Sequence, residues 1–216
     1  MNLEEIIKDI DIIAVLQIDN AEDAVCLAET LLEGGIRAME LTLRTPAALD
    51  ALRAIHERVP EMTAGVGTIL TPEQVREVKA IGARFGVSPG LNRNVMQEAK
   101  EQDLPFAPGV ATPSDIETAM ELGCRTMKFF PAEPQGGLKY LNSMTAPYNH
   151  LGLQFIPLGG LNEKNLRDYL ESPLIGAVGG SWIAPRTLIQ HKEWDEIRQR
   201  ATTASAIALN IKKESK

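Results

Sequence analysis

Cysteine is scarce in this sequence. The 216-residue chain has two, Cys26 and Cys124, with no CxxC spacing between them. Two thiols in a chain of this length are typical of a reduced cytosolic protein and argue against a disulfide framework. Aromatic residues make up only 5% of the chain, so we expect a mostly aliphatic core in which Trp182 and Trp194 pack.

Basic tracts and long apolar runs are missing as well. The net charge of −7 and the lack of clustered lysine and arginine argue against nucleic acid as a partner. No apolar run approaches the roughly 18 residues that span a bilayer, and residues 1–5, MNLEE, do not resemble a signal peptide. We therefore expect a cytoplasmic protein with no membrane partner. His56, His150 and His191 lack metal-ligand spacing and are expected at the surface.

Short apolar segments alternate with longer amphipathic ones along the whole chain. The predicted strands are Ile12–Gln17, Ala38–Leu43, Thr63–Gly67, Phe85–Ser88, Phe106–Pro108, Thr126–Phe130, Gln154–Leu158 and Ala177–Val178. The predicted helices are Ala21–Leu32, Pro46–Arg58, Pro72–Ile81, Asn94–Glu101, Pro113–Leu122, Leu138–Met144, Glu163–Leu170 and Glu193–Ile211, followed by a solvated Lys212–Lys216 tail. Thr45, Thr71 and Thr112 each precede a proline and are predicted N-caps.

This alternation predicts an α/β fold. Eight βα alternations without a linker-like break indicate one parallel domain, and the count fits a closed (β/α)8 TIM barrel. We expect residues 1–216 to form this single barrel, with a short N-terminal helix and a C-terminal helix. The alternative is a doubly wound open sheet, but residues 17–21 lack the glycine-rich turn that would support it.

Lys128 is the most informative residue, because it lies in the otherwise apolar strand Thr126–Phe130. Buried parallel strands are near-continuous apolar runs, and an ammonium there is costly unless it is paired or loses its proton. A neutral lysine amine is a nucleophile toward carbonyl groups. Glu40 interrupts a second buried strand in the same way, and two such charges suggest an active site. The alternative for Lys128 alone is an ion pair or a side chain that extends to the surface.

Side-chain alternation places Glu40, Thr42 and Arg44 on one face, and Lys128 and Phe130 on one face of another strand. The second and sixth strands of an eight-stranded barrel lie opposite each other, so Glu40 and Lys128 are expected to converge. A purely structural ion pair is the alternative, although such pairs rarely gain stability over apolar packing.

Glycine pairs follow the last two predicted strands, in the segments Pro157–Asn162 and Val178–Trp182. Barrel enzymes often bind phosphate with the loops after strands seven and eight. Glycines let backbone N–H groups approach an anion closely. These segments therefore predict a phosphate site.

Six motifs together resemble the 2-keto-3-deoxy-6-phosphogluconate (KDPG) and 4-hydroxy-2-oxoglutarate aldolase family, from about residue 5 to residue 205. They are Glu40–Arg44, Gly65–Thr68, Ser88–Gly90, Pro108–Pro113, Lys128–Glu133 and Gly179–Trp182. The resemblance implies a (β/α)8 barrel that needs no metal or other cofactor and commonly forms a homotrimer. Its small-molecule partners are 2-keto acids, with pyruvate and a phosphorylated aldehyde as products of KDPG.

The resemblance also implies residue roles. Lys128 matches the lysine that forms a Schiff base with the 2-keto carbon, and Glu40 the carboxylate that shuttles protons. The substrate-binding positions match Arg44 and Thr68 for the carboxylate and reacting end, Pro89 and Phe130 for the pocket lining, and Gly159, Gly160, Gly180 and Ser181 for phosphate.

Two positions depart from the family pattern. Leu158 stands where phosphogluconate-specific members usually have threonine, and Gln17 where many have arginine or lysine. The expected substrate is therefore KDPG, its C4 epimer 2-keto-3-deoxy-6-phosphogalactonate, 4-hydroxy-2-oxoglutarate, or several of these. Two other functions stay open: an isomerase or synthase that uses Glu40 without a covalent lysine, and a non-catalytic barrel that binds a keto-acid phosphate.

Overall fold

The strands of this protein pair in parallel and form two curved sheets. The computed structural model describes residues 3–214. Its strands are β1 (Ile12–Leu16), β2 (Ala38–Thr42), β3 (Thr63–Gly67), β4 (Gly86–Val87), β5 (Phe106–Ala107), β6 (Gly109–Val110), β7 (Thr126–Phe129), β8 (Gln154–Pro157) and β9 (Val178–Gly180). One sheet has the order β5-β4-β3-β2-β1-β9, and the other has the order β6-β7-β8. The last strand therefore pairs with the first, and strands β1 to β5 follow one another without the reversal of a doubly wound sheet.

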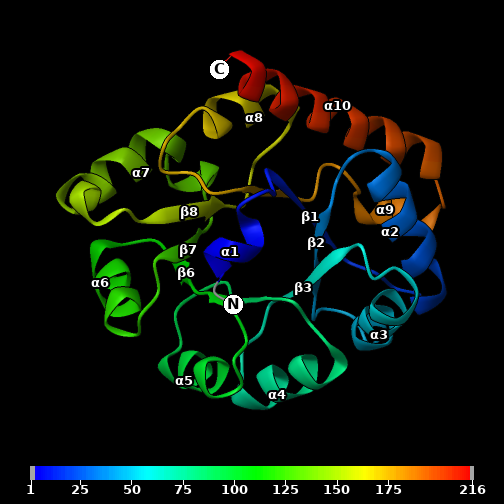
Figure 1. Cartoon of the computed structure of the whole chain (residues 1–216), viewed down its shortest axis with the longest axis horizontal. Helices are drawn as coiled ribbons and strands as arrows, with labels where there is room; N and C mark the ends of the chain where they lie inside the picture. The colour runs from blue at the N-terminus through cyan, green and yellow to red at the C-terminus, as the bar shows by residue number, and fades with distance from the viewer. Residues whose placement is uncertain (1–2, 215–216) are drawn as a thin grey trace.

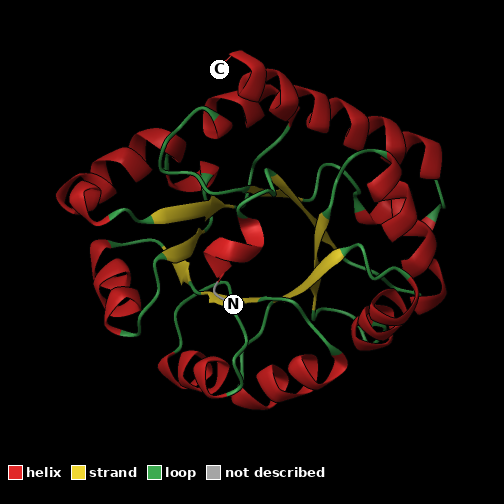
Figure 2. Cartoon of the chain, in the orientation of Figure 1, coloured by secondary structure: helices red, strands yellow, loops and turns green. Residues whose placement is uncertain are grey.

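Helices surround the two sheets (Figure 2). The α-helices are α1 (Leu3–Ile7), α2 (Ala24–Glu33), α3 (Ala48–Arg58), α4 (Pro72–Ile81), α5 (Arg93–Glu101), α6 (Pro113–Glu121), α7 (Gly137–Thr145), α8 (Glu163–Leu170), α9 (Arg186–Gln190) and α10 (Trp194–Glu214). Three 3-10 helices are η1 (Ala21–Asp23), η2 (Glu133–Gln135) and η3 (Ala146–Leu151). Figure 1 shows α1 across the centre of the ring of strands and α10 along the outside, where it packs on α2 and α8.

The apolar residues form two clusters, one on each face of the strands. The outer cluster joins strand residues such as Met39 and Met127 to the inner faces of the helices. The inner cluster lies between the strands and includes Ile13, Phe85 and Ile156, and it is continued by Leu3 and Ile7 of α1. Side-chain alternation therefore gives each strand a helix-facing and an interior-facing set. The interior set also includes the polar residues of the candidate site.

The predicted fifth strand, Phe106–Pro108, is two short strands, β5 and β6, on either side of Pro108. Proline has no N–H for the ladder, so the strand is interrupted there. The carbonyl of Pro108 still accepts a hydrogen bond of 2.9 Å from the backbone N–H of Lys128. The predicted strand Phe85–Ser88 is shorter too, since β4 spans only two residues.

Helix α3 begins two residues later than predicted. The hydroxyl of Thr45 donates to the carbonyl of Ile18, in the loop after β1, and does not cap the helix. Thr71 and Thr112 do cap α4 and α6, as the sequence predicts. A tertiary partner therefore outcompeted the local cap at only one of the three Thr-Pro positions.

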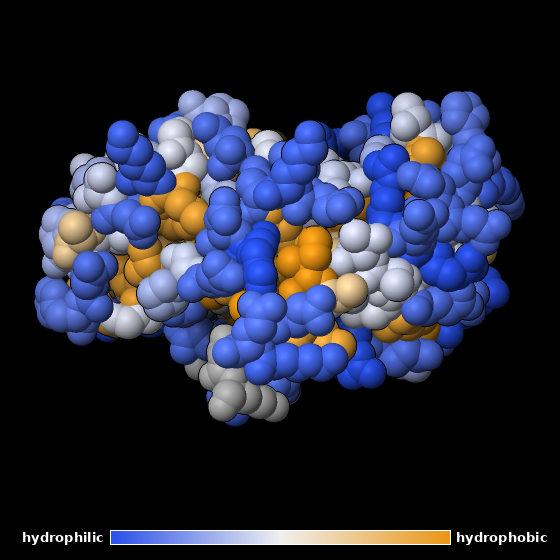
Figure 3. Space-filling model, turned by 90° about the horizontal axis from the view of Figure 1, so that it is seen from above, coloured by the Kyte–Doolittle hydropathy of each residue, from blue (hydrophilic) through white to orange (hydrophobic). Residues whose placement is uncertain are grey.

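The predicted solvated tail is also corrected in part, because α10 continues through Lys212 to Glu214. Lys212 forms an ion pair of 2.7 Å with Asp11, and Glu214 pairs with Arg167 of α8. These contacts fix the last described turn; residues 215–216 lie outside the described part. The face over α10 is largely hydrophilic with small hydrophobic areas (Figure 3), and Leu209 of this helix is 53% exposed.

Candidate active site

Glu40 and Lys128 meet between the two sheets. Glu40 is the central residue of β2, and Lys128 lies in β7, the middle strand of the second sheet. Both are buried, with 2% and 5% of their surface exposed. The Nζ atom of Lys128 lies 3.4 Å from Oε1 of Glu40. The two side chains therefore converge, as alternation along each strand leads one to expect.

The space around the Glu40 carboxylate depends on Gly67. A β-carbon at Gly67 would lie only 1.8 Å from Oε1 of Glu40. Gly67 is the residue opposite Thr42 in the β2–β3 pairing. The Glu40 carboxylate therefore extends along the sheet and packs against the backbone of Gly67. A glycine inside a strand often marks such a close approach. Gly67 belongs to the motif Gly65–Thr68, but its own role was not predicted from the sequence.

Apolar and polar neighbours complete the surroundings of the pair. The ring centre of Phe130 lies 5.3 Å from the Nζ of Lys128, a distance at which a ring attracts an ammonium. The hydroxyl of Thr42 donates to the carbonyl of Leu16 on β1 at 2.9 Å. Each buried ion is costly to desolvate, and a single ion pair seldom repays that cost in stability. The arrangement therefore suits chemistry better than packing.

Arg44 lies in the turn that follows β2, and its side chain is exposed. Within residues 3–214 its guanidinium has no hydrogen bond or ion pair, so its donors are available to a ligand. Its backbone N–H donates to Thr42 at 2.7 Å, which holds the turn. A planar guanidinium binds both oxygens of a carboxylate. The structure places Arg44 beyond the strand end, where its side chain forms no hydrogen bond or ion pair with Lys128 or Glu40.

Thr68, immediately after β3, has a left-handed backbone with φ of 62°. This conformation is unusual for a β-branched residue and costs about 1–3 kcal/mol. Strain of this kind clusters at ligand sites, and Thr68 directly follows the glycine that contacts Glu40. Pro89, after β4, is exposed, and its carbonyl packs so closely on Gly109 that a β-carbon there would be 2.2 Å away.

The two glycine-rich loops lie side by side at the carboxyl ends of β8 and β9. A β-carbon at Gly179 would be 2.6 Å from Cδ1 of Leu158, so these two residues touch across the strands. Gly159 and Gly160 have φ of 97° and 85°, which favour glycine. Within the described residues their N–H groups form no backbone hydrogen bond. The loop thus offers free donors to an anion.

Neighbouring segments hold this loop in place. The N–H of Ala132 donates to Leu158 at 2.7 Å, and the N–H of Glu133 donates to Gly159 at 3.0 Å. The Glu133 side chain packs on Gly160 and accepts a hydrogen bond from the hydroxyl of Tyr169. Burial, with a smaller contribution from this hydrogen bond, raises the pKa of Tyr169, so it remains a donor.

The last strand supplies the other two predicted phosphate-binding positions. Gly180 ends β9, and a β-carbon there would collide with the ring of Trp182. Ser181 is exposed, and its hydroxyl has no partner within residues 3–214. The predicted site residues therefore all lie in the interior or at the carboxyl ends of the strands. Among them, Lys128 contacts both Glu40 and the ring of Phe130.

Residues 3–214 hold no cluster of three or more His, Cys, Asp or Glu side chains that could bind a metal ion. None of the helices in this part of the chain has the length and apolar character of a membrane span. His56, His150 and His191 are exposed, as predicted.

Comparison with known proteins agrees with this geometry. The family model described as KDPG and KHG aldolase matches residues 3–200. A 2-dehydro-3-deoxy-phosphogluconate aldolase of Haemophilus influenzae is 42% identical over 193 residues, which cover 89% of this chain and 90% of that protein. A KHG/KDPG aldolase of Escherichia coli is 39% identical over 201 residues, covering 93% of each chain.

A solved structure is similar over almost its whole length. The KDPG aldolase of Legionella pneumophila, crystallised with pyruvate captured as a covalent carbinolamine intermediate, superposes with a TM-score of 0.90. It is 36% identical, and the match covers 94% of this chain and 98% of that one.

Proposed function

Because the chain belongs to the KDPG and KHG aldolase family, we propose that it is a class I aldolase, a carbon–carbon lyase that works through a Schiff base. The observation that carries this proposal is the buried pair of Lys128 and Glu40, whose reactive atoms lie 3.4 Å apart. An amine and a carboxylate at this separation can exchange a proton directly or through one water.

Lys128 supplies the nucleophile. Glu40 takes a proton from Lys128, whose amine then adds to the 2-keto carbon. Glu40 returns that proton to the hydroxyl of the resulting carbinolamine, which leaves as water and gives a protonated imine. The iminium withdraws electrons from the C3–C4 bond. Glu40 takes the proton of the C4 hydroxyl, so the bond breaks, the aldehyde leaves, and the electron pair forms an enamine of pyruvate. Protonation at C3 and addition of water then release pyruvate and restore Lys128.

The strand ends hold the rest of the substrate. Arg44 binds the carboxylate next to the keto group, because its guanidinium is free and two-pronged. Thr68 contacts the reacting end. Pro89 and Phe130 line the pocket, and the phosphate lies on the backbone of Gly159, Gly160, Gly180 and Ser181. The free N–H groups of the first loop support this assignment, since they suit an anion.

We also propose that the strands close into one (β/α)8 barrel domain. Only Pro108 separates β5 of the first sheet from β6 of the second. At the other seam, Phe155 of β8 forms a parallel bridge to Ile175, just before β9. The chain itself thus joins the two sheets at one seam, and a backbone bridge joins them at the other, which supports closure. Family resemblance further supports a cytoplasmic location and a homotrimer. Analytical ultracentrifugation would test the trimer.

The substrate is proposed to be KDPG, 4-hydroxy-2-oxoglutarate (KHG), or the C4 epimer of KDPG. Leu158, which touches Gly179 in the interior, presents no hydroxyl to distinguish the C4 epimers. The test is release of pyruvate from each of the three compounds, compared by kcat/KM. We expect turnover of KDPG or KHG. Turnover of none of the three would contradict the proposed function.

A further inference from the structure

A cavity of about 900 Å³ lies at the amino ends of the strands, away from the Lys128–Glu40 site. Arg84, before β4, and Arg125, before β7, are part of its lining. Leu3 and Ile6 of α1 form one side, and Phe106 of β5 is part of the apolar wall. Neither Lys128 nor Glu40 lines this cavity, so it is distinct from the candidate active site.

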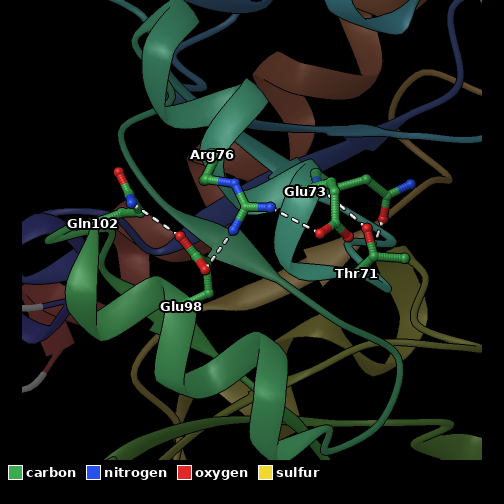
Figure 4. A network of polar contacts seen from close by, with 6 residues as sticks. Thr71, Glu73, Arg76, Glu98 and Gln102 are labelled. Carbon is green, nitrogen blue, oxygen red and sulfur yellow. Dashed lines mark hydrogen bonds and ion pairs between the residues drawn. The ribbon is translucent and has the colours of Figure 1, made fainter.

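Two neighbouring helices that line the cavity are fastened to each other. On α4, Arg76 pairs with Glu73 at 2.8 Å and reaches across to Glu98 of α5 at 2.6 Å (Figure 4). Glu98 also accepts a hydrogen bond from Gln102. Because Glu98 is only 13% exposed, this link is less screened than a fully exposed pair. The cavity therefore has a defined wall.

The charge of the cavity lining is opposite to that of the whole protein. The lining contains four basic residues and two acidic ones, Glu4 and Asp103, whereas the protein has a net charge of −7. Two of the basic residues, Lys79 and Lys100, lie in the last turns of α4 and α5, where they offset the helix dipoles.

Helix dipoles do not explain the presence of Arg84 and Arg125 in the cavity lining. Both lie in loops, where their backbones bond to neighbouring strands, but neither guanidinium group has a hydrogen bond or ion pair within residues 3–214. The strands that they precede, β4 and β7, are separated by the β5–β6 segment, so their backbones are about 10 Å apart. Two extended arginine side chains can close that gap onto one oxyanion.

Thr126 adds a second, independent observation. It is 3% exposed and lines the cavity, and its hydroxyl oxygen is covered yet has no hydrogen-bond partner within residues 3–214. Buried polar groups are nearly always paired, so an orphan hydroxyl needs an explanation. Thr126 is also on the strand of Lys128, two residues earlier and therefore on the same face.

We propose that this cavity binds a small amphipathic oxyanion, such as a phosphate monoester of an apolar group. Arg84 and Arg125 bind the phosphate oxygens, and the covered hydroxyl of Thr126 is uncovered on binding and supplies one further hydrogen bond. The apolar part packs against Leu104 and Phe106, which line the same cavity. This second site is separate from the aldolase site and does not depend on its assignment.

The test uses protein labelled with ¹³C at the methionine methyl groups and phenyl phosphate as the probe. Met96 lines the cavity, whereas Met144 on α7 does not. Phenyl phosphate should shift the Met96 signal in a saturable way and leave Met144 unmoved. Benzyl alcohol, which lacks the anion, should not shift Met96 at the same concentrations. An unmoved Met96 signal would overturn the proposal.

Substitution of the two arginines tests whether they bind the phosphate group of the probe. The double variant Arg84→Ala/Arg125→Ala should weaken binding of phenyl phosphate about tenfold or more, since hydrogen bonds to charged groups are lost. Arg53→Ala is the matched control, because Arg53 pairs with Asp50 on the exposed face of α3 and does not line the cavity. Undiminished binding by the double variant, or an equal loss in the control, would refute the assignment.

Thr126→Val tests the orphan hydroxyl. Valine has the same shape, so the unliganded protein should melt at the same or a higher temperature. Its affinity for phenyl phosphate should nevertheless fall several-fold. Unchanged affinity would show that the hydroxyl does not contact the probe and would remove Thr126 from the site.

Discussion

Substitution of Gly67 by alanine tests whether the position of the Glu40 carboxylate controls turnover. The added β-carbon would lie 1.8 Å from Oε1 and 2.5 Å from the carboxyl carbon of Glu40, whereas ordinary contact begins at 3.4 Å. The carboxylate must therefore retreat by more than an ångström. A misplacement of about 1 Å can cost about 10²-fold in rate, so we expect kcat to fall by about that factor.

The assay follows pyruvate release with lactate dehydrogenase as the coupling enzyme. Gly67→Ala should still form an imine at Lys128, because the amine itself is not displaced, and overpacking should destabilise the fold by about 1–3 kcal/mol. Gly90→Ala is the matched control, since a β-carbon there meets nothing within 4 Å. Unchanged turnover in a folded Gly67→Ala protein would refute the reasoning.

Three other substitutions or modifications give independent checks. Glu40→Gln should retain measurable imine formation but lower turnover by about 10²–10⁴-fold, the usual contribution of a positioned acid–base group; unchanged turnover would mean that another group moves the proton. Leu158→Thr should raise the ratio of kcat/KM for KDPG over its C4 epimer, because a hydroxyl can then read the C4 substituent; an unmoved ratio would remove Leu158 from this choice. Iodoacetamide at about pH 8 should modify exposed Cys26 well before Cys124, since only the thiolate reacts and burial raises the pKa of Cys124 to about 11. The Cys124 rate should increase as the pH approaches 11, and equal rates at the lower pH would contradict this account.

Local sequence rules predicted much of the framework. The bounds of α4 and α8 match the prediction, because the residue just before each helix is a good N-cap, Thr71 for α4 and Asn162 for α8. Alternation along two strands was sufficient to bring Glu40 and Lys128 together. Both cases depend on residues that are close in sequence or on a regular strand period.

Other features depend on neighbours that are distant in sequence. Thr45 bonds to Ile18, so its predicted role as an N-cap was wrong. The contact between Gly67 and Glu40 joins two strands, and only the strand position of the glycine hinted at it. The cavity at the amino ends of the strands combines residues from α1, α4 and α5 with strand starts, which no single segment reveals.

The most direct measurement of the central claim is reductive trapping of the imine. Pyruvate with borohydride should add one reduced pyruvyl group to the chain, and peptide mass spectrometry should find it at Lys128. Lys128→Arg should abolish the adduct, because a guanidinium does not form this imine. An adduct at exposed Lys139 or Lys164, or no adduct at all, would contradict the account; the latter result would favour an isomerase, a synthase or a binding protein that uses Glu40 without a covalent lysine.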